Sequence, residues 1–373
     1  MRTILILMGR YLPGHKDGGP LRTMINVTDA LGDEYDFRIA CLDRDHGDTQ
    51  PYPGVKCDEW NPVGKARVWY VKPGGFSFRL IRELANAADL VYTCSFYDDY
   101  GYKTLLLHRL NRLYQKPVVV ASMGVFSEGA LAHKAIKKRM FIGLCKALGM
   151  FNNITWSVTS ELEADDLRRV IGNKAKYEIA EDLPRPNVPG RMAHSKEVLD
   201  VVFLSRICPK KNLLGAVRIM QKVKSRVNFN IYGPIEDRAY WGQCKEQLDK
   251  LPPNIIWNYY GDVPSEDVQA VFQKNDIFLF PTLGENYGHV IFEALSTGCI
   301  PVISDQTPWE RIAENRAGFI IPIKALEEFT ARIEQLHTMP AEGRNCMAEN
   351  AVELACETVK RTHYSTGYRT IFG

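Results

Sequence analysis

Two loops of the sequence carry residue types suited to binding phosphate and sugar hydroxyls. In "FLSRICPKKNLL", residues 203–214, Arg206 ends an apolar run, and Lys210, Lys211 and Asn212 directly precede a predicted helix. Cations at the carboxyl end of a strand and beside a helix N-terminus are placed to neutralise phosphate. The alternative is a solvated basic turn, which the spacing alone does not exclude.

The other loop, in "PTLGENYGHVIFEALSTGCIPVISD", residues 281–305, carries two carboxylates. Glu285 lies in the loop, and Glu293 lies within a helix that we expect to start near Gly288. Carboxylates here could accept hydrogen bonds from the hydroxyls of a sugar or ribose, and the backbone N–H groups of residues 286–289 would face the same ligand. The alternative is an amphipathic helix with two solvent-facing glutamates.

Two further turns are weaker candidates. "GRYLPGHKDGGPLRT", residues 9–23, joins a predicted strand to a predicted helix, and Gly18 and Gly19 would let the backbone approach an anion. In "YYGDVPSEDV", residues 259–268, we expect Ser265 to cap the next helix. A plain glycine-rich turn and a plain strand–turn–helix are the alternatives.

The elements that must position these loops are short apolar runs alternating with segments of helical period. Runs rich in Val and Ile are typical of strands buried on both faces, as in parallel sheets covered by helices. The predicted strands cover residues 3–8, 37–42, 90–94, 117–122, 155–159, 200–204, 228–232, 255–260, 276–281, 300–304 and 318–322. This alternation predicts two doubly wound α/β domains, in which ligands bind beyond the carboxyl ends of the strands. The expected site is the cleft between the domains.

One stretch interrupts the alternation. "DLPRPNVPGRMAHSKEV" contains three prolines and a glycine, which predicts a linker at residues 183–198. The chain is thereby divided into an N-terminal domain, residues 1–182, and a C-terminal domain that begins at residue 199.

Composition excludes several classes of protein. The 373 residues carry 47 Lys and Arg against 44 Asp and Glu, and this net charge of +3 gives no reason to expect nucleic acid as a partner. The nine cysteines and eight histidines form no ligand motif, so we expect free thiols in a reducing cytosol and no metal. No apolar run is long enough to span a membrane.

Together, "GGPLR", "SRICPKKN", "YGDV" and "GENYGHVIFEALSTGCIPV" resemble the retaining nucleotide-sugar glycosyltransferases of family 4. Their order and separation fit that family across nearly the whole chain, and "TPW" at residues 307–309 is similar to a bacterial branch that builds surface polysaccharides. The resemblance implies the GT-B fold, with two Rossmann-like domains facing across a cleft. The C-terminal domain would end at residue 356, and a helix within residues 357–373 would cross back to complete the N-terminal domain.

The resemblance also implies roles for single residues. Arg206 and Lys211 would hold the diphosphate and stabilise charge as the donor C1–O bond breaks, and Glu285 completes the expected catalytic set. Glu293 would bind the ribose, and Val263 would line the base pocket. The full expected donor-binding set is Gly18, Gly19, Arg206, Lys211, Val263, Glu285, Asn286, Tyr287, Gly288 and Glu293.

The activity implied is transfer of a sugar, with retention of configuration, from a UDP- or GDP-sugar. The acceptor would be a saccharide or a lipid-linked saccharide in polysaccharide or lipopolysaccharide biosynthesis, and neither metal nor cofactor would be needed. Two alternatives stay open. A nucleotide-sugar epimerase of the same fold would isomerise the donor alone, and a non-catalytic protein would bind it without turnover.

The acceptor side departs from the family pattern. Many members carry a histidine after the fourth N-terminal strand, where this chain has Ser122 and Met123. The candidates for the missing contacts are His15, Arg22, Ser127 and Glu128.

The segment "LAHKAIKKRMFIGLCKALGM", residues 131–150, interleaves cations with apolar residues and contains no acid. Such a helix can lie on an anionic membrane, which would place a cytoplasmic protein on the inner face of the cell membrane. The alternative is a helix whose apolar face packs on its own sheet.

Overall fold

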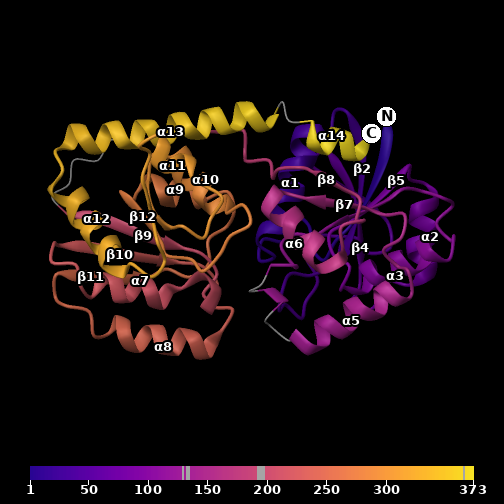
Figure 1. The fold of residues 1–373 in the computed structure, drawn as a ribbon, viewed down its shortest axis with the longest axis horizontal. Coiled ribbons are helices and arrows are strands. Elements are labelled where there is room, and N and C mark those ends of the chain that lie inside the picture. The colour runs from indigo at the N-terminus through magenta and orange to yellow at the C-terminus, as the bar shows by residue number, and fades with distance from the viewer. Residues whose placement is uncertain (128–129, 132–134, 191–197, 364–365) are drawn as a thin grey trace. The chain divides into compact units, whose positions relative to one another are not determined.

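The computed structural model describes residues 1–127, 130–131, 135–190, 198–363 and 366–373. The chain divides into two compact α/β units (Figure 1). The N-terminal unit comprises Met1–Leu183 and Thr362–Gly373, and the C-terminal unit comprises Pro184–Arg361. All nine cysteines are free thiols. Among the described helices, none combines the length and the apolar character needed to cross a bilayer.

The N-terminal unit contains a sheet in the order β3-β4-β2-β1-β5-β6-β7-β8. Its strands are β1 (Arg2–Leu7), β2 (Tyr35–Leu42), β3 (Trp60–Val63), β4 (Ala66–Val71), β5 (Leu90–Thr93), β6 (Val118–Ala121), β7 (Thr155–Val158) and β8 (Tyr177–Ile179). All neighbours are parallel except β3, which pairs antiparallel with β4 at the edge. The helices are α1 (Gly19–Leu31), α2 (Phe78–Asn86), α3 (Asp99–Arg109), α5 (Ala135–Ala147), α6 (Glu161–Ile171) and α14 (Gly367–Phe372).

The C-terminal unit has an all-parallel sheet in the order β11-β10-β9-β12-β13-β14. Its strands are β9 (Leu199–Leu204), β10 (Val227–Tyr232), β11 (Ile255–Tyr259), β12 (Ile277–Phe280), β13 (Ile300–Ser304) and β14 (Phe319–Ile321). Its helices are α7 (Leu213–Met220), α8 (Arg238–Leu248), α9 (Val268–Gln273), α10 (His289–Ser296), α11 (Arg311–Glu314) and α12 (Leu326–Thr338). Helix α13 (Ala341–His363) forms the end of the unit up to Arg361, and its last two residues belong to the N-terminal unit.

Strand β1 shows why apolar runs predict this architecture. Its side chains alternate between two cores: Ile4 and Ile6 pack in one, and Leu5 and Leu7 pack in the other. Because successive side chains of a strand point to opposite faces, a strand covered by helices on both sides must be apolar throughout. The predicted doubly wound α/β fold is therefore confirmed in each unit.

The chain's tail completes the N-terminal unit through aromatic packing. Phe372 of α14 is buried, and its ring lies 5.4 Å from Tyr35, 5.6 Å from Phe37 and 5.9 Å from Tyr92 between centroids. The return was expected to begin at residue 357. In the structure, residues up to Arg361 belong to the C-terminal unit, because α13 continues without a break past residue 357.

The expected linker, residues 183–198, is bound to the C-terminal unit over part of its length. Arg185 donates a hydrogen bond to the Ser265 hydroxyl, and the Gly190 N–H donates to the carbonyl of Ser296 at 3.0 Å. The prolines do exclude helix and strand here, but side-chain and backbone bonds fix residues 184–190 on the unit. Residues 191–197 lie outside the described part of the chain.

Candidate functional site

The two phosphate- and sugar-type loops of the C-terminal unit leave neighbouring strands. Numbered along the chain, the six strands of this sheet run 3-2-1-4-5-6, so the order reverses between β9 and β12. In doubly wound sheets, ligands bind where the order reverses, beyond the carboxyl ends of the strands. Residues 205–212 follow β9 and residues 281–288 follow β12, so both loops lie at this point.

An ion pair joins the two loops. The Lys211 ammonium contacts the Glu285 carboxylate, and the two side chains are only 12% and 10% exposed. The Thr282 hydroxyl donates to the same carboxylate oxygen at 3.2 Å. Glu285 is therefore not the solvent-facing residue of the alternative interpretation, and the lysine expected at phosphate lies beside the glutamate expected at sugar.

Asn212, next to Lys211, connects the two loops. Its backbone is left-handed, with φ of 59°, and its side-chain oxygen caps α7 by accepting the Gly215 N–H at 3.1 Å. Its amide nitrogen donates to the Pro281 carbonyl at 2.8 Å, in the loop after β12. One side chain thus starts a helix and ties both loops together.

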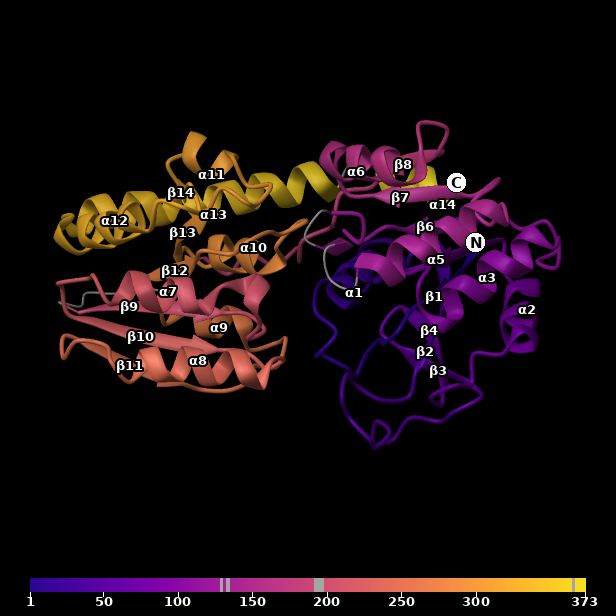
Figure 2. The same ribbon diagram turned by 60° about the horizontal axis from the view of Figure 1, so that its bottom comes forward.

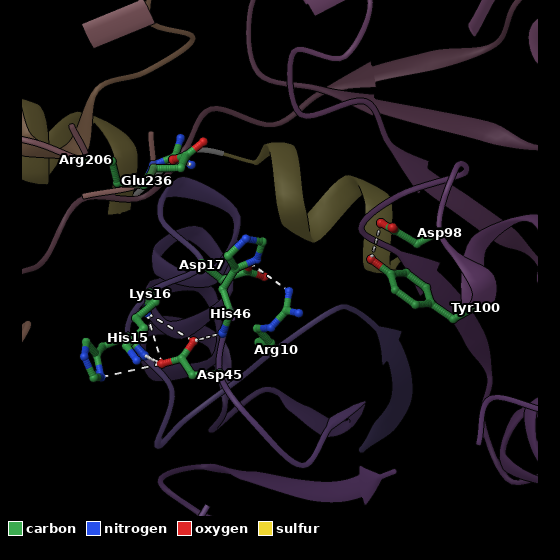
Figure 3. A network of polar contacts seen from close by, with 10 residues as sticks. All are labelled: Arg10, His15, Lys16, Asp17, Asp45, His46, Asp98, Tyr100, Arg206 and Glu236. Carbon is green, nitrogen blue, oxygen red and sulfur yellow. Dashed lines mark hydrogen bonds and ion pairs between the residues drawn. The ribbon is translucent and has the colours of Figure 1, made fainter. Parts of the chain in front are cut away.

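Two more cations belong to this cluster. Partial desolvation lowers the pKa of Lys210, with Glu285 opposing this effect and the charges of Lys211 and Arg206 adding to it. Arg206 is 41% exposed and pairs with Glu236 at 2.7 Å, in the loop after β10 (Figure 3). Because exposed ion pairs contribute little, Arg206 can exchange Glu236 for a stronger anion. The sequence pattern gave no signal for Glu236.

Glu293 lies inside α10 and is 3% exposed, which also overturns the solvent-facing alternative. The Arg185 guanidinium lies 3.5 Å from its carboxylate and donates to Ser265 Oγ at 2.5 Å. Ser265 was expected to cap the next helix, and this was wrong: α9 begins only at Val268 and has no side-chain cap. Arg185 was missed because an irregular, proline-rich segment has no period that predicts where a side chain docks.

The loop before α10 has a fixed backbone. Gly288 is the N-cap with φ of 81°, and a Cβ there would lie 2.9 Å from the Ile291 side chain. The carbonyl of Tyr287 accepts the Trp309 indole N–H at 2.5 Å. Asn286 precedes these residues in the loop and is half-buried. This turn leaves the first N–H groups of α10 at the reversal of strand order, where they favour an anion or a sugar oxygen. Val263 lies farther out, after the edge strand β11, partly buried against the core.

In the N-terminal unit the strand order reverses between β1 and β5, and the glycine-rich loop follows β1. The loop ends at Gly18, with φ of 68°, and Gly19 begins α1. Arg22, one turn later, is half-buried and donates its backbone N–H to the Gly18 carbonyl at 3.2 Å. The two glycines therefore occupy the helix start at which anions are favoured.

A carboxylate missed in the sequence holds this loop. Asp45, 3% exposed, accepts the backbone N–H groups of His15 at 2.7 Å, Lys16 at 3.2 Å and His46 at 2.8 Å (Figure 3). His15 is 41% exposed, with Nδ1 3.6 Å from the same carboxylate. It therefore stays a candidate for contact with an acceptor.

A second carboxylate, Asp17, pairs with Arg10 at 3.1 Å in the same loop (Figure 3). Burial raises the pKa of Asp17, and the Arg10 charge opposes that increase. The loop is thus held at Asp45 and at Asp17.

The loop after β6 offers less than the sequence suggested. The Ser127 hydroxyl donates to the Gly124 carbonyl at 3.0 Å and so closes a turn, and Ser122 is buried with its hydroxyl on the Ser157 carbonyl. Glu128 lies outside the described residues. Glu163, which the sequence did not single out, is buried and accepts the N–H groups of Gly124 and Thr159.

Within the part of the chain that the structure describes, no three His, Cys, Asp or Glu side chains gather into a group that could hold a metal ion.

Known proteins resemble this chain in sequence and in fold. Residues 186–354 match the family model described as "Glycosyl transferases group 1". A protein of the Klebsiella pneumoniae cps region is 27% identical over 158 residues, 41% of this chain and 41% of its own length. The Escherichia coli O-antigen chain mannosyltransferase B is 26% identical over 141 residues, 36% of this chain and 35% of its own length. The matched part of the chain therefore spans about two fifths or less of the length of these relatives.

The fold is shared over the whole chain. The structure of Anabaena HepE in complex with UDP-glucose superposes with a TM-score of 0.71, covering 100% of this chain and 99% of that chain at 14% identity. The protein thus has the GT-B fold, and its residues 186–354 are similar to the glycosyl transferases group 1 family.

Proposed function

We propose that this protein is a retaining glycosyltransferase that uses a UDP- or GDP-linked sugar as donor. The acceptor is a saccharide or a lipid-linked saccharide in polysaccharide or lipopolysaccharide biosynthesis. The observation that carries the proposal is the Lys211–Glu285 pair at the reversal of strand order, with Arg206 and Lys210 beside it. Support comes from the family match over residues 186–354 and from the O-antigen mannosyltransferase as a relative.

The cation cluster suits departure of a nucleoside diphosphate. As the donor C1–O bond breaks, negative charge grows on the leaving phosphate, and ordered cations stabilise that charge more than they stabilise the intact donor. Lys211 is already ordered by Glu285, so little reorganisation is needed when the donor arrives. In this proposal Arg206 leaves Glu236 for the phosphate, and the reaction requires neither metal nor cofactor.

The carboxylates suit the two polyhydroxyl parts of the donor. Glu285 accepts hydrogen bonds from the transferred sugar, beside the N–H groups at the start of α10. Glu293 accepts hydrogen bonds from the ribose hydroxyls, and the Arg185 guanidinium, 3.5 Å from that carboxylate, holds it in place. Val263 contacts the base. The leaving phosphate takes the acceptor's proton, so no separate carboxylate base is invoked.

The N-terminal unit binds the acceptor in this proposal. Asp45 fixes the loop that precedes Gly18 and Gly19, and an ordered loop presents the N–H groups of α1 to an anion at low entropic cost. His15, Arg22 and Ser127 are the described candidates for contact with the acceptor.

The test is release of nucleoside diphosphate from a sugar nucleotide. Lys211→Ala and Glu293→Ala abolish donor hydrolysis and transfer while circular dichroism shows an intact fold. Lys222→Ala, an exposed lysine of the same unit, leaves activity unchanged. Normal turnover in both site variants would refute the proposal. An isomerised nucleotide sugar formed from donor alone would identify an epimerase, and binding without turnover would identify a non-catalytic protein.

A further inference from the structure

Helix α5 of the N-terminal unit has two apolar faces. Ile142 and Cys145 are buried, and Phe141 packs partly buried against the same core. This inward face attaches the helix to its sheet, as the packing interpretation of the sequence expected. The helix nevertheless carries further apolar residues that this packing does not use.

The second face points to solvent. Ile136 is 77% exposed, Met140 71%, Leu144 57% and Leu148 50%. These residues recur every fourth position, which places them in one row on a helix. Leu148 follows the last residue of α5, and its N–H bonds to the Leu144 carbonyl at 2.9 Å, so the row continues through one more turn.

Exposure of this kind is concentrated rather than scattered. The described residues include twelve exposed large apolar side chains, and four of them lie between residues 136 and 148. Single exposed apolar residues are normal, whereas a contiguous group marks a surface that contacts something else.

Exposed cations flank this row on both sides. By helical geometry, Lys137 lies along one edge, and Arg139 and Lys146 lie along the other. No acid occurs in Ala135–Ala147. Lys138 differs from them, because it turns inward to donate to the Ala130 carbonyl at 2.6 Å.

The neighbouring helix adds one more cation. Helices α3 and α5 lie side by side in both views (Figures 1 and 2), and Arg109 donates to the Leu148 carbonyl at 3.1 Å. Positive charge therefore extends to the carboxyl end of the row.

We propose that this face of α5 docks on an anionic lipid bilayer. The α5 surface comprises the apolar residues Ile136, Met140, Leu144 and Leu148 and the cations Lys137, Arg139 and Lys146. A helix lying in the interface plane buries its apolar row at the level of the acyl chains and keeps its flanking cations among anionic headgroups. A second copy of this chain would instead bring like charges together across a two-fold axis.

This inference needs neither sugar transfer nor donor binding. It adds a partner to the proposed function, because a lipid-linked acceptor would lie in the same bilayer. Vesicle binding without turnover would leave the docking proposal standing while the catalytic proposal failed, so the two failures are distinguishable.

The test is sedimentation of the full chain with vesicles of phosphatidylcholine alone or mixed with phosphatidylglycerol. The protein binds the mixed vesicles, and high salt weakens that binding. Each cation at the surface is worth about a fivefold change in affinity, so Lys137→Gln/Arg139→Gln/Lys146→Gln weakens binding about 100-fold. Ile136→Gln/Met140→Gln/Leu144→Gln weakens binding by a similar factor of about 100.

Two control variants test whether a loss of binding is specific to the α5 surface or follows from any loss of positive charge or of exposed apolar side chains. Lys174→Gln/Lys176→Gln/Lys324→Gln removes three positive charges from exposed lysines outside the α5 surface. We expect this variant to bind the mixed vesicles about as tightly as the intact chain does. Leu162→Gln/Ile256→Gln removes side chains that are 69% and 55% exposed outside the α5 surface and also has little effect.

Equal binding to both kinds of vesicle, or α5 variants that bind as the controls do, would overturn the proposal. A dimer of the intact chain in size-exclusion chromatography, absent in Ile136→Gln/Met140→Gln/Leu144→Gln, would also overturn the proposal. It would show that the apolar row contacts a second copy of the chain. Unchanged thermal unfolding in the α5 variants shows that lost binding is not lost folding.

Discussion

Replacing Lys211 by methionine tests the structural core of the candidate site. The substitution keeps an unbranched side chain near the Phe280 ring, over which the ammonium lies at 5.8 Å, but leaves Glu285 without its cation. Breaking a buried ion pair on one side costs about 3–5 kcal/mol. Because about a tenth of each side chain meets water, we expect about 3 kcal/mol, near the lower end.

Removing both charges tests whether the cost comes from the unpaired carboxylate. The double variant Lys211→Met/Glu285→Gln leaves no buried charge, and Thr282 can still hydrogen-bond to the new amide. We expect it to recover most of the loss, which corresponds to a coupling energy of about 2 kcal/mol. Additive effects of the two single changes would contradict the coupling.

Hydrogen exchange followed by mass spectrometry suits a chain of two units, because it reports each unit separately. A loss of about 3 kcal/mol raises the local opening equilibrium about 100-fold in peptides from β9, α7 and β12. Peptides of the N-terminal unit serve as an internal control. Lys222→Met breaks an exposed pair with Glu327 and costs less than about 1 kcal/mol. If Lys211→Met exchanged no faster than Lys222→Met, the account of the pair would be refuted.

Three further predictions follow from the same contacts. Arg185→Ala removes the cation beside the Glu293 carboxylate and weakens nucleotide binding about 10- to 100-fold in calorimetry, whereas Arg185→Lys recovers part of the loss. Unchanged binding in Arg185→Ala would show that Arg185 has no role in the site. Arg206→Ala lowers kcat about 10²- to 10³-fold, but Glu236→Gln changes kcat little, because Arg206 contacts Glu236 only when no donor is bound. An equal loss of kcat in the two variants would contradict the proposal that Arg206 exchanges Glu236 for the donor phosphate. Burial raises the pKa of Asp182 from 3.8 to about 7, so the folded state binds a proton that the unfolded chain releases. The free energy of unfolding of the N-terminal unit therefore falls by up to about 4 kcal/mol between pH 4 and 7. Hydrogen exchange should show no such fall in Asp182→Asn. A fall that persists in this variant would show that another group causes it.

The strands that pack on both faces were predictable because their apolar runs are continuous. β9 was expected at residues 200–204 and spans Leu199–Leu204, and β1 was expected at residues 3–8 and spans Arg2–Leu7. The β3–β4 hairpin was not expected. Its edge strand β3 contains Pro62 and half-exposed residues, so it lacks the apolar run that marks a buried strand.

The candidate site also contains residues that could be predicted from the sequence and residues that could not. Lys211 and Glu285 could be placed in one site because each lies in the loop after an apolar strand, and neighbouring parallel strands end at the same edge. Their separate roles came from the resemblance to a family, because the spacing alone left the alternatives open. Arg185, Glu236 and Asp45 could not be placed, because their roles come from contacts between segments far apart in the chain. The apolar residues of α5 were visible in the sequence, but only burial divides them into an inward and an outward face.

The most direct test of the central claim is a thermal-shift panel of UDP-, GDP- and ADP-sugars on the intact chain. The claim is that the C-terminal unit holds a nucleoside diphosphate sugar through Arg206, Lys211, Glu285 and Glu293. At 100 times its Kd a donor stabilises the folded state by about 2.7 kcal/mol, which raises the Tm of a unit of this size by about 5–10 °C. The account predicts such a rise with UDP- or GDP-sugars, and its loss in Lys211→Ala and Glu293→Ala relative to each variant's own ligand-free Tm. No rise with any sugar nucleotide, or an equal rise in both variants, would contradict it.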